Sequence, residues 1–501
     1  MIRREERKMD DARRYFKDDP QVELELREER ISKLKALREK GIDPYPVKFS
    51  RDMDILAIRK NFDALVEKYR SSENPPGAIS TAGRVMAVRE HGRATFLDIH
   101  DENERIQVFL SRNNFPENYK FILKMLDVGD IVGVKGIPFY TRRGEPTIEA
   151  KEFYFLSKSL RPMPEKWHGL KDVEIRYRRR YVDLIVNPQV REIFRIRSRV
   201  ISTIRKILTD KGFLEVETPI MQPVPGGAAA KPFITHHNAL DMDLYLRIAP
   251  ELYLKRLIVG GYEKVFELGK NFRNEGISTR HNPEFTMMEV YQAYADYTDM
   301  MELAEEIISE TAREVFGSYE VNGINYSKPW KKVSLKELFK EKVGLDISSG
   351  VDWEEVEKKA GEFGIEGETP KKKFDNLFGK LIEPELIQPT IVYDYPVEIS
   401  PLAKRHPDDP KFVQRFEIFI RGQEIGNAYS ELNDPVDQLE RFREQEEERE
   451  GWVDWDFVRA LEYAMPPTGG LGIGIDRLVM TYLGIDSIRE VILFPLLRPR
   501  T

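Results

Sequence analysis

Charged and aromatic residues with a capacity for chemistry occur at close spacing in the middle of the chain. Arg273 and Glu275 close the segment 266–275, and Phe285 follows after a short loop. The planar fork of an arginine can hold an α-phosphate while negative charge builds up in a transition state. A phenylalanine ring in the same place could stack on adenine. These residue types therefore indicate a site for a bound nucleotide.

A second segment, 469–480, places four glycines before Arg477 and a run of apolar residues with helical spacing. Glycine permits a close approach of the backbone to a ligand. The segment does not match the P-loop pattern, because no Gly-Lys-Ser/Thr follows. It does not match a dinucleotide fingerprint either, because no strand with a later ribose-binding acid is apparent. Taken alone, a glycine-rich turn of this kind is most often structural.

Two strands joined by a loop would position Arg273 and Phe285. Residues 266–275 predict the first strand and residues 286–291 the second. Upstream of them, residues 190–211 carry apolar side chains at spacings of three and four and end at Gly212. This pattern predicts a long amphipathic helix.

Residues 211–221 predict a strand that contains an acidic pair, Glu215 and Glu217, and is closed by Pro219. Proline inside a strand belongs at the edge of a sheet. That edge could pair with a second copy of the chain across a twofold axis, or it could be an ordinary edge strand. The sequence alone does not decide between the two.

The first third of the chain predicts a helix followed by a small barrel. Residues 22–40 predict a charged helix, because Gly41 is a plausible cap and Pro44 forbids continuation. Five β-rich runs follow at 84–88, 94–99, 105–110, 130–134 and 147–155. Five short strands suggest an oligonucleotide-binding barrel, on whose open face bases can stack. Phe96, with Arg89 and Gln107, could form that face, or its ring could belong to the core.

The composition excludes several classes of protein. With 501 residues and 41% hydrophobic residues, the chain can bury one large core and a smaller second one. The lack of cysteine excludes disulfides and thiolate metal sites, so any metal must sit on oxygen or imidazole ligands. No apolar run reaches signal-peptide or membrane-spanning length, and we expect a cytosolic protein. The net charge of −7 leaves local basic clusters free to bind phosphate.

Two charged segments keep alternative interpretations. Residues 1–20 could be a solvated tail or an arm that binds nucleic acid. The arginine-rich segment 176–181, which lies between the barrel and the long helix, could contact phosphate or brace one domain against the other.

Taken in order, three segments resemble motifs one, two and three of the class II aminoacyl-tRNA synthetases. They are residues 211–221, the loop Phe272-Arg273-Asn274-Glu275 and the run Gly472-Ile473-Gly474-Ile475-Asp476-Arg477. The N-terminal barrel is similar to that of the aspartate, asparagine and lysine subgroup, and the resemblance covers roughly residue 22 to the end.

The resemblance implies an α+β fold, with an antiparallel sheet flanked by helices and an N-terminal all-β OB-fold barrel. We expect a charged N-terminal extension and helix in residues 1–75, an OB-fold anticodon-binding domain in 76–160 and a linker in 161–189. The catalytic domain should occupy 190–501, and the resemblance implies a homodimer.

Segments 225–228, 249–253 and 424–433 resemble the lysine-specific enzymes of this subgroup. The resemblance implies that Gly227 and Glu251 hold the α-ammonium group of lysine, Arg273 and Asn427 its carboxylate, and Tyr291 with Glu431 its ε-ammonium group. Glu289 and Tyr429 would complete the pocket; Tyr429 and its neighbour Ala428 stand where many relatives have Phe and Gly. A buried ammonium is costly unless it is paired, and a neutral amino acid would leave the carboxylate of Glu431 unpaired.

The same resemblance assigns ATP contacts to Arg273, Asn274, Glu275, His281, Asn282, Phe285, Glu417, Glu424, Gly474 and Arg477. Glu417 and Glu424 would hold Mg²⁺, which prefers oxygen ligands, although such a pair is otherwise typical of a solvated surface. Arg273, Glu275 and Arg477 are the expected catalytic groups. The implied reaction is attack of the lysine carboxylate on the α-phosphorus, followed by transfer of lysine to the 3′-terminal adenosine of a transfer RNA.

On the barrel, the resemblance implies that Phe96 stacks on the central uridine of the anticodon, with Arg89, Gln107 and Glu145 nearby. Two other classes of function stay open. A related enzyme that attaches an amino acid to a protein would tend to lack the barrel. An inactive binding protein should have lost Arg273, Glu417 or Arg477, which are all present.

Overall fold

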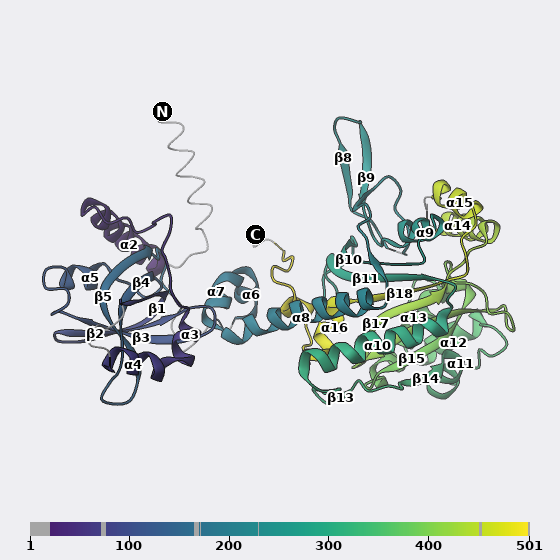
Figure 1. The fold of residues 1–501 in the computed structure, drawn as a ribbon. Helices are drawn as coiled ribbons and strands as arrows, with labels where there is room; N and C mark the ends of the chain where they lie inside the picture. Colours follow the sequence, from purple (N-terminus) through teal and green to yellow (C-terminus); the bar gives the residue numbers. More distant parts are fainter. Residues whose placement is uncertain are drawn as a thin grey trace. The chain divides into compact units, whose positions relative to one another are not determined.

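The computed structural model describes residues 21–71, 77–164, 170, 172–228, 230–449 and 453–498. The chain forms two compact units, residues 1–169 and 170–501 (Figure 1). The predicted tail, residues 1–20, lies outside the described residues. Within the described part, no helix is long and apolar enough to cross a membrane.

The N-terminal unit is built on a closed barrel with the strand order β1-β2-β3-β5-β4. Its strands are β1 (Ile79–His91), β2 (Ala94–His100), β3 (Arg105–Ser111), β4 (Ile131–Tyr140) and β5 (Pro146–Ser157). β3 and β5 pair in parallel and the other pairs are antiparallel. Alternate residues such as Leu97, Ile99, Ile106 and Val108 are buried inside. The five predicted runs are therefore confirmed as strands, each longer than predicted.

In the described part of the same unit there are four helices: α2 (Gln21–Glu39), α3 (Ile55–Lys60), α4 (Phe62–Ser71) and α5 (Tyr119–Met125). Leu37, Ile58 and Phe62 from the first three share one hydrophobic cluster with the barrel interior. The helix predicted over 22–40 is confirmed, and it packs on the barrel.

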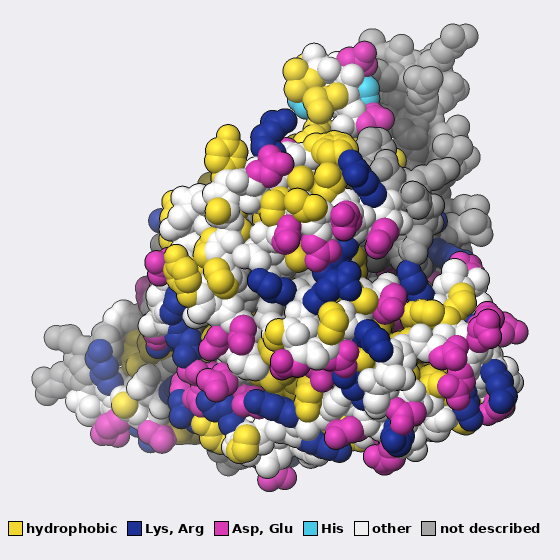
Figure 2. Space-filling model, turned by 90° about the vertical axis from the view of Figure 1, so that its right-hand side faces the viewer, with side chains coloured by type: hydrophobic (Ala, Val, Ile, Leu, Met, Phe, Trp, Pro, Cys, Tyr) yellow, Lys and Arg dark blue, Asp and Glu magenta, His cyan; other side chains and the backbone are white. Residues whose placement is uncertain are grey.

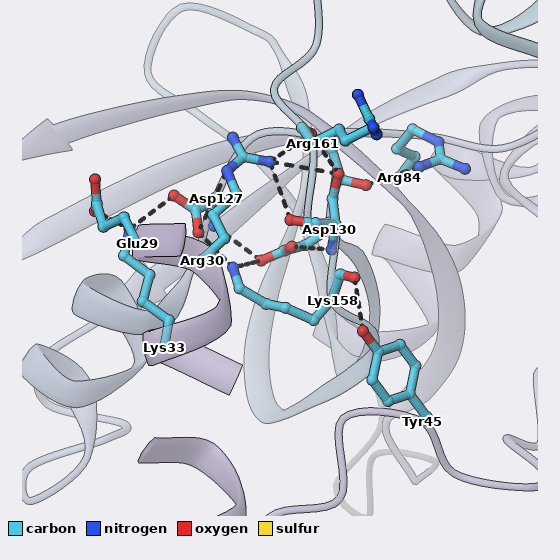
Figure 3. A network of polar contacts seen from close by, with 11 residues as sticks. Glu29, Arg30, Lys33, Tyr45, Arg84, Asp127, Asp130, Lys158 and Arg161 are labelled. Carbon is cyan, nitrogen blue, oxygen red and sulfur yellow. Dashed lines mark hydrogen bonds and ion pairs between the residues drawn. The ribbon is translucent and has the colours of Figure 1, made fainter. Parts of the chain in front are cut away.

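A buried polar network holds α2 against the barrel (Figure 3). Lys158, fully buried after β5, donates from Nζ to Asp127 at 2.5 Å and to Asp130 at 2.8 Å. From α2, Lys33 donates to Asp127 at 2.8 Å, and Arg30 donates to the carbonyl of Arg161 at 2.7 Å. Because charges this deeply buried need partners, the network fixes where the helix docks.

The C-terminal unit is built on a sheet of eight strands in the order β14-β15-β16-β17-β18-β11-β10-β6. The two outermost pairs, β14–β15 and β10–β6, are parallel and the pairs between them are antiparallel. The strands are β6 (Leu214–Glu215), β10 (Lys264–Phe272), β11 (Glu284–Ala293), β14 (Lys331–Ser334), β15 (Thr390–Pro396), β16 (Phe412–Ile420), β17 (Gln423–Ser430) and β18 (Thr468–Gly474).

Three helices cover one face of this sheet: α8 (Pro188–Asp210), α10 (Tyr297–Phe316) and α16 (Ile475–Leu483). Buried side chains from the helices, such as Ile204 and Ile308, meet Val290, Leu471 and Ile473 of the strands in the largest hydrophobic cluster of the unit. Because this face is closed by helices, polar side chains that point to the other face are left to form a site.

The other elements lie around this frame. A three-stranded sheet in the order β7-β9-β8 contains a hairpin that projects from the unit in Figure 1. Figure 2 shows acidic, basic and apolar side chains interspersed over one face of the molecule. The remaining elements are α6 (Val173–Arg178), α7 (Arg180–Val186), β7 (Met221–Gln222), β8 (Ile234–His237), β9 (Met242–Leu246), α9 (Glu251–Val259), β12 (Glu320–Val321), β13 (Ile324–Asn325), α11 (Leu335–Leu338), η1 (Phe339–Val343), α12 (Trp353–Glu362), α13 (Pro370–Leu381), η2 (Glu383–Glu385), η3 (Val397–Ile399), α14 (Pro435–Arg449), α15 (Trp455–Glu462) and α17 (Ile488–Val491).

Two local predictions are wrong. The strand predicted over 211–221 is reduced to β6 and β7, which have two residues each and belong to different sheets. The glycines of 469–474 form no turn but lie in β18, a central strand. The strand–loop–strand prediction around Arg273 is confirmed, as is the long helix over 190–211.

The arginine-rich segment 176–181 braces the C-terminal unit from within. Arg176 forms ion pairs with Asp183 and Glu490, both at 3.0 Å. Arg180, fully buried, binds Asp183 at 2.7 Å and donates to the carbonyl of Leu493 at 3.0 Å. These guanidinium groups are committed to contacts inside the unit.

Candidate active site

The register of three central strands explains why the site needs glycines. Gly470 of β18 lies between Tyr291 of β11 and Tyr429 of β17, and Gly472 lies between Glu289 and Asn427. Directly opposed residues in a sheet point to the same face. A Cβ on Gly470 would come within 1.9 Å of Glu431 Oε1 and 2.7 Å of the Tyr291 ring. The glycines of β18 therefore form a floor on which larger side chains from both neighbouring strands converge.

A cavity opens over the ends of these strands. It encloses about 950 Å³ of empty space, a figure that includes the solvent at its open mouth. Of the residues predicted to contact ATP, it brings together Arg273, Glu275, His281, Asn282, Phe285, Glu424, Gly474 and Arg477, and it also contains Asn427. Asn274 and Glu417 do not line the cavity. Asn274 directly follows Arg273, and Glu417 pairs with Asn427 in the sheet, and both of these neighbours do line it.

Basic groups lie on two sides of this cavity. The guanidinium of Arg273 is 5.2 Å from the centre of the Phe285 ring. Arg477 donates to Glu424 Oε2 at 3.2 Å and lies 3.3 Å from Nε2 of His281. Burial and the charge of Arg477 lower the pKa of His281, so this imidazole is neutral at physiological pH. The cavity is thus lined by three arginines, Arg273, Arg280 and Arg477, which suit a polyanionic ligand.

Arg197 and Asp476 support the cavity from the helical side. Arg197 of α8 forms an ion pair with Asp476 at 2.6 Å and donates to Thr286 Oγ1 at 3.0 Å. Asp476 also accepts a hydrogen bond from the backbone N–H of Thr286 at 2.6 Å. These contacts link α8, α16 and β11. The long helix predicted over 190–211 and the glycine-rich segment 469–480 therefore both support the wall of this cavity. The sequence analysis did not single out Arg197.

Glu417 of β16 faces the same side of the sheet as Asn427, its partner in β17. Its carboxylate accepts from Arg415 at 2.6 Å and from the hydroxyl of Tyr395 at 2.9 Å. Burial raises the pKa of Glu417 to about 7, with Arg415 opposing the rise and Glu424 adding to it.

The described residues include no group of three or more acidic or histidine side chains arranged to hold a metal ion. Glu424 nevertheless lies close enough to Glu417 for its charge to raise the pKa of Glu417. Two oxygen donors of this kind fit Mg²⁺, which usually completes its shell with waters and substrate phosphates.

Next to this cavity, carboxylates gather around a lysine that the sequence analysis did not single out. Lys255 of α9 is fully buried, and its Nζ donates to Glu251 Oε1 at 2.6 Å. The same ammonium forms an ion pair with Glu431. The other oxygen of Glu251 accepts from the hydroxyl of Tyr429 at 2.9 Å. A spacing of four residues on the helix, which lets Glu251 and Lys255 meet, was the only signal in the sequence.

Glu289 and Tyr291 complete this acidic cluster from β11. The hydroxyl of Tyr291 donates to Glu289 at 3.1 Å. Burial, together with the charge of Glu251, raises the pKa of Glu289 to about 8. Burial likewise raises the pKa of Glu431 well above its usual range, although Lys255 opposes the rise. Carboxylates that are reluctant to ionise indicate a place where additional positive charge is expected.

Gly227 borders the same cluster in a conformation that favours glycine. Its φ is +85°, and a Cβ there would lie 3.1 Å from the Cβ atoms of both Ala249 and Glu251. All eight residues predicted around the amino acid thus lie on or beside one face of the sheet. Among them, Glu251 and Glu431 are joined through Lys255, an arrangement that the sequence analysis did not foresee.

On the barrel, three of the predicted anticodon residues share the outer face. Phe96 pairs with Arg89 in the strand register, and Gln107 pairs with Asp98. The Phe96 ring is half-buried and lies 5.1 Å from that of Phe109, a residue not singled out from the sequence. The guanidinium of Arg89 makes two bonds of 2.7 Å to Asp98. Glu145 follows on the loop before β5, 3.8 Å from Arg105.

A sheet with a glycine-floored antiparallel centre, a cavity lined by arginines and an OB-fold barrel in the same chain together define a class II synthetase. Accordingly, the model of the tRNA synthetases class II (D, K and N) matches residues 172–498, and that of the OB-fold nucleic acid binding domain matches residues 79–156. The chain belongs to this class II synthetase family. Its members are ATP-dependent ligases that join amino acids to transfer RNA.

Several curated relatives match nearly the whole chain. The lysine–tRNA ligase of Syntrophomonas wolfei is 53% identical over 491 residues, which cover 95% of this chain and 98% of that protein. The lysine–tRNA ligase of Pelotomaculum thermopropionicum is 55% identical and covers 95% of both chains. That of Carboxydothermus hydrogenoformans is 53% identical, over 95% of this chain and 98% of its own length.

Proposed function

We propose that this protein activates L-lysine with ATP to form lysyl-adenylate and pyrophosphate, and then transfers lysine to the 3′-terminal adenosine of tRNA(Lys). The observation that carries the proposal is the balance of charge in the acidic cluster. Three carboxylates, those of Glu251, Glu289 and Glu431, are accompanied by Lys255 and Arg273, which leaves one net negative charge when all are ionised. Arg247 also acts on Glu289, but its charge is already balanced by its ion pair with Glu267. Free lysine, with two ammonium groups and one carboxylate, supplies the single positive charge that is lacking.

The same balance argues against other amino acids. A neutral amino acid would leave one buried carboxylate without a counter-charge, and an acidic one would leave two. Leaving a buried charge unpaired costs about 2 kcal/mol or more, which suffices for strong discrimination. The lysine–tRNA ligases that match the chain end to end support this choice of substrate.

In this proposal the amino acid lies across the glycine floor. Gly227 and Glu251 take its α-ammonium group, Tyr291 and Glu431 its ε-ammonium group, and Arg273 with Asn427 its carboxylate. Glu289 supports the hydroxyl of Tyr291, and Tyr429 closes the pocket above Glu251. The carboxylate would thereby point toward the cavity that we assign to ATP.

For ATP, we assign Phe285 to the adenine, with Asn274, Glu275, Asn282 and Gly474 nearby, and Arg273, His281 and Arg477 to the phosphates. Arg273 would neutralise charge on the α-phosphate as the lysine carboxylate attacks and pyrophosphate leaves. Glu417 and Glu424 would hold Mg²⁺, which supplies charge neutralisation at the phosphates when bound. The activation step needs no general base, because the attacking carboxylate is already ionised.

We further propose that the barrel reads the anticodon, with Phe96 as the stacking platform and Arg89, Gln107 and Glu145 beside it. Because charged tRNA serves the ribosome, we place the enzyme in the cytoplasm. A homodimer would form through the edge next to β6, where Leu214, Ile220 and Met221 expose 45%, 44% and 56% of their surfaces. Light scattering of the unaltered protein and of Met221→Asp tests the dimer.

The central test is exchange of pyrophosphate into ATP, measured with a panel of amino acids that includes lysine, ornithine, arginine, methionine and aspartate. We expect strong exchange with lysine, weak exchange with ornithine, which is one methylene shorter, and essentially none with the neutral and acidic members. Exchange that depends on methionine or aspartate instead of lysine would refute the proposal.

A further inference from the structure

Lys255 occupies a place in the pocket that the proposed reaction does not explain. The side chain is fully buried, it is not expected to touch ATP, and its ammonium lies between Glu251 and Glu431. These two carboxylates are the ones assigned to opposite ends of the substrate. A cation between them therefore connects the two halves of the amino-acid site.

Among the described residues, the charged groups that act most strongly on Lys255 are acidic. Glu251 comes from its own helix, Glu431 from the residue after β17, and Glu289 lies beyond them on β11. The nearby phenols are Tyr291 and Tyr429, and α15 contributes the uncharged ring of Phe457 at 5.9 Å from Nζ. Because the attraction of these carboxylates outweighs burial, the pKa of Lys255 is raised and the group is charged at neutral pH.

Resting on the proposed function, we infer that Lys255 is a positioning residue that pre-arranges the lysine pocket. In the empty site it holds Glu251 and Glu431 in one geometry and offsets part of their charge. When lysine binds, each carboxylate keeps one oxygen on Lys255 and offers the remainder of its surface to a substrate ammonium. Lys255 thereby fixes the distance between the carboxylates of Glu251 and Glu431. It also sets the net positive charge that a substrate needs in order to balance the pocket.

The consequence of removing this cation follows from the charge balance. Without Lys255, the three carboxylates would exceed the positive charge of Arg273 and bound lysine by one. One of the three carboxylates, most readily that of Glu431, would retain a proton in the complex with lysine. It would then hold the ε-ammonium group weakly. Affinity for lysine should then continue to rise with pH over a range in which the unaltered protein has already reached its plateau.

The test compares Lys255→Met with Arg256→Met, the loss of a neighbouring, partly buried cation from the same helix. Arg256 pairs with Asp454 at 2.8 Å and makes no contact with the pocket carboxylates. For both variants and the unaltered protein, the KM for lysine and the KM for ATP are measured by pyrophosphate exchange from pH 6.5 to 8.5.

We expect Lys255→Met to raise the KM for lysine about tenfold or more at pH 7 and the KM for ATP less than about twofold, with the plateau of the lysine pH profile displaced upward. Arg256→Met should leave the lysine KM and its pH profile unchanged. Lys255→Arg should recover much of the affinity, because it restores the charge. If Lys255→Met does not fold, Lys255→Gln, which loses the charge but still donates a hydrogen bond, takes its place.

Chemical rescue provides a second readout that a purely structural role would not give. Lys255→Ala leaves a cavity that methylammonium can fill, so this ion should lower the lysine KM of that variant and not that of Lys255→Met. Equal increases of the lysine and ATP KM values, or an unchanged lysine pH profile in Lys255→Met, would overturn the inference while leaving the proposed function intact. Lack of lysine-dependent exchange in the unaltered protein would overturn both.

Discussion

Gly470 and Glu431 approach each other so closely that a single added methyl group would not fit between them. A Cβ on Gly470 would lie 1.9 Å from Glu431 Oε1, well inside any permitted contact. Gly470 is held between Tyr291 and Tyr429 in the middle of the sheet, so its backbone cannot move aside. The glycine is thus required by the position of a side chain in the proposed substrate pocket and not by the conformation of a turn.

Gly470→Ala should therefore displace Glu431 and reduce lysine activation. A displacement of about 1 Å at a positioning group costs roughly a hundredfold in rate, and we expect kcat/KM for lysine to fall by at least that factor. ATP binding, measured by fluorescence titration in the absence of lysine, should be nearly unaltered. Gly361→Ala, in α12 and outside the cavity lining, is the control, because nothing lies within 4 Å of a Cβ at that position. Normal lysine activation by Gly470→Ala would show that β18 can shift enough to accommodate the added methyl group without displacing Glu431.

Arg273→Ala should abolish lysine-dependent exchange of pyrophosphate into ATP. Arg273 lines the cavity and lies over the ring of Phe285, where it is placed to neutralise the α-phosphate. Loss of such an electrostatic contact costs roughly a hundredfold to a thousandfold in kcat. Arg280→Ala, which removes an exposed arginine from the same cavity lining, should have a smaller effect. Near-normal exchange by Arg273→Ala would remove this residue from the proposed role.

Binding of lysine should release a proton near neutral pH, and Glu289 should be its source. The pKa of Glu289 is about 8 in the empty protein, above the value of 4.5 for an exposed glutamate, so the carboxyl is mostly neutral at pH 7. The second ammonium of lysine would favour the ionised form. Calorimetry in two buffers of different ionisation enthalpy measures the release, which should approach one proton and disappear in Glu289→Gln.

The raised pKa of Glu289 also affects the stability of the empty protein. A carboxyl whose pKa is raised by folding contributes its full stability below pH 4.5, and that contribution is lost as the pH rises through about 8. Melting temperatures of the empty protein should therefore fall from pH 5 to pH 8 more steeply than those of Glu289→Gln. Lysine should reduce the fall. Identical slopes for the two proteins would contradict the assignment of the raised pKa.

Phe96→Ala should weaken charging of tRNA while it spares formation of the adenylate. Loss of one base-stacking contact costs about 1–3 kcal/mol, so the KM for tRNA should rise between roughly fivefold and a hundredfold. Tyr154→Ala, an aromatic truncation elsewhere on the barrel, should leave tRNA charging unaltered. If Phe96→Ala impaired adenylate formation equally, the ring would matter for stability instead.

Local patterns in the sequence predicted several elements, because each depends on neighbours along the chain, whereas the fold class was predicted from the resemblance of three motifs to a known family. The long helix, the five barrel strands and the strands that flank Arg273 were all recognised from periodicity. The glycines of β18 were misinterpreted as a turn, because their cause lies in Tyr291, Tyr429 and Glu431, which are distant in sequence and become neighbours only in the sheet.

Residues that act through other residues were the hardest to find. Lys255 and Arg197 carry charges on helices, where such side chains usually face solvent, and nothing in their spacing indicated burial. Their roles depend on partners more than 170 residues away, Glu431 and Asp476. Motif resemblance identified the residues expected to touch the substrates, but it did not identify those that hold these residues in place.

Lys158→Met should destabilise the N-terminal unit, because it leaves buried acidic groups without their main counter-charge. Lys158 and Asp130 are both fully buried and lie 2.8 Å apart, and Lys158 also binds Asp127. Breaking a buried ion pair by removal of one partner costs about 3–5 kcal/mol. Calorimetry of the full chain should show a transition that is lowered by roughly 10 °C.

Lys135→Met is the matched control, since Lys135 pairs with Glu152 on the surface of the same barrel, and both side chains are more than one-third exposed. Exposed pairs contribute little to stability, so this variant should melt almost as the unaltered protein does. Because α2 reaches the network through Lys33 and Arg30, Lys158→Met should also expose α2 to hydrogen exchange, whereas Lys135→Met should not. Equal melting temperatures for the two variants would mean that the network orders α2 without stabilising the barrel.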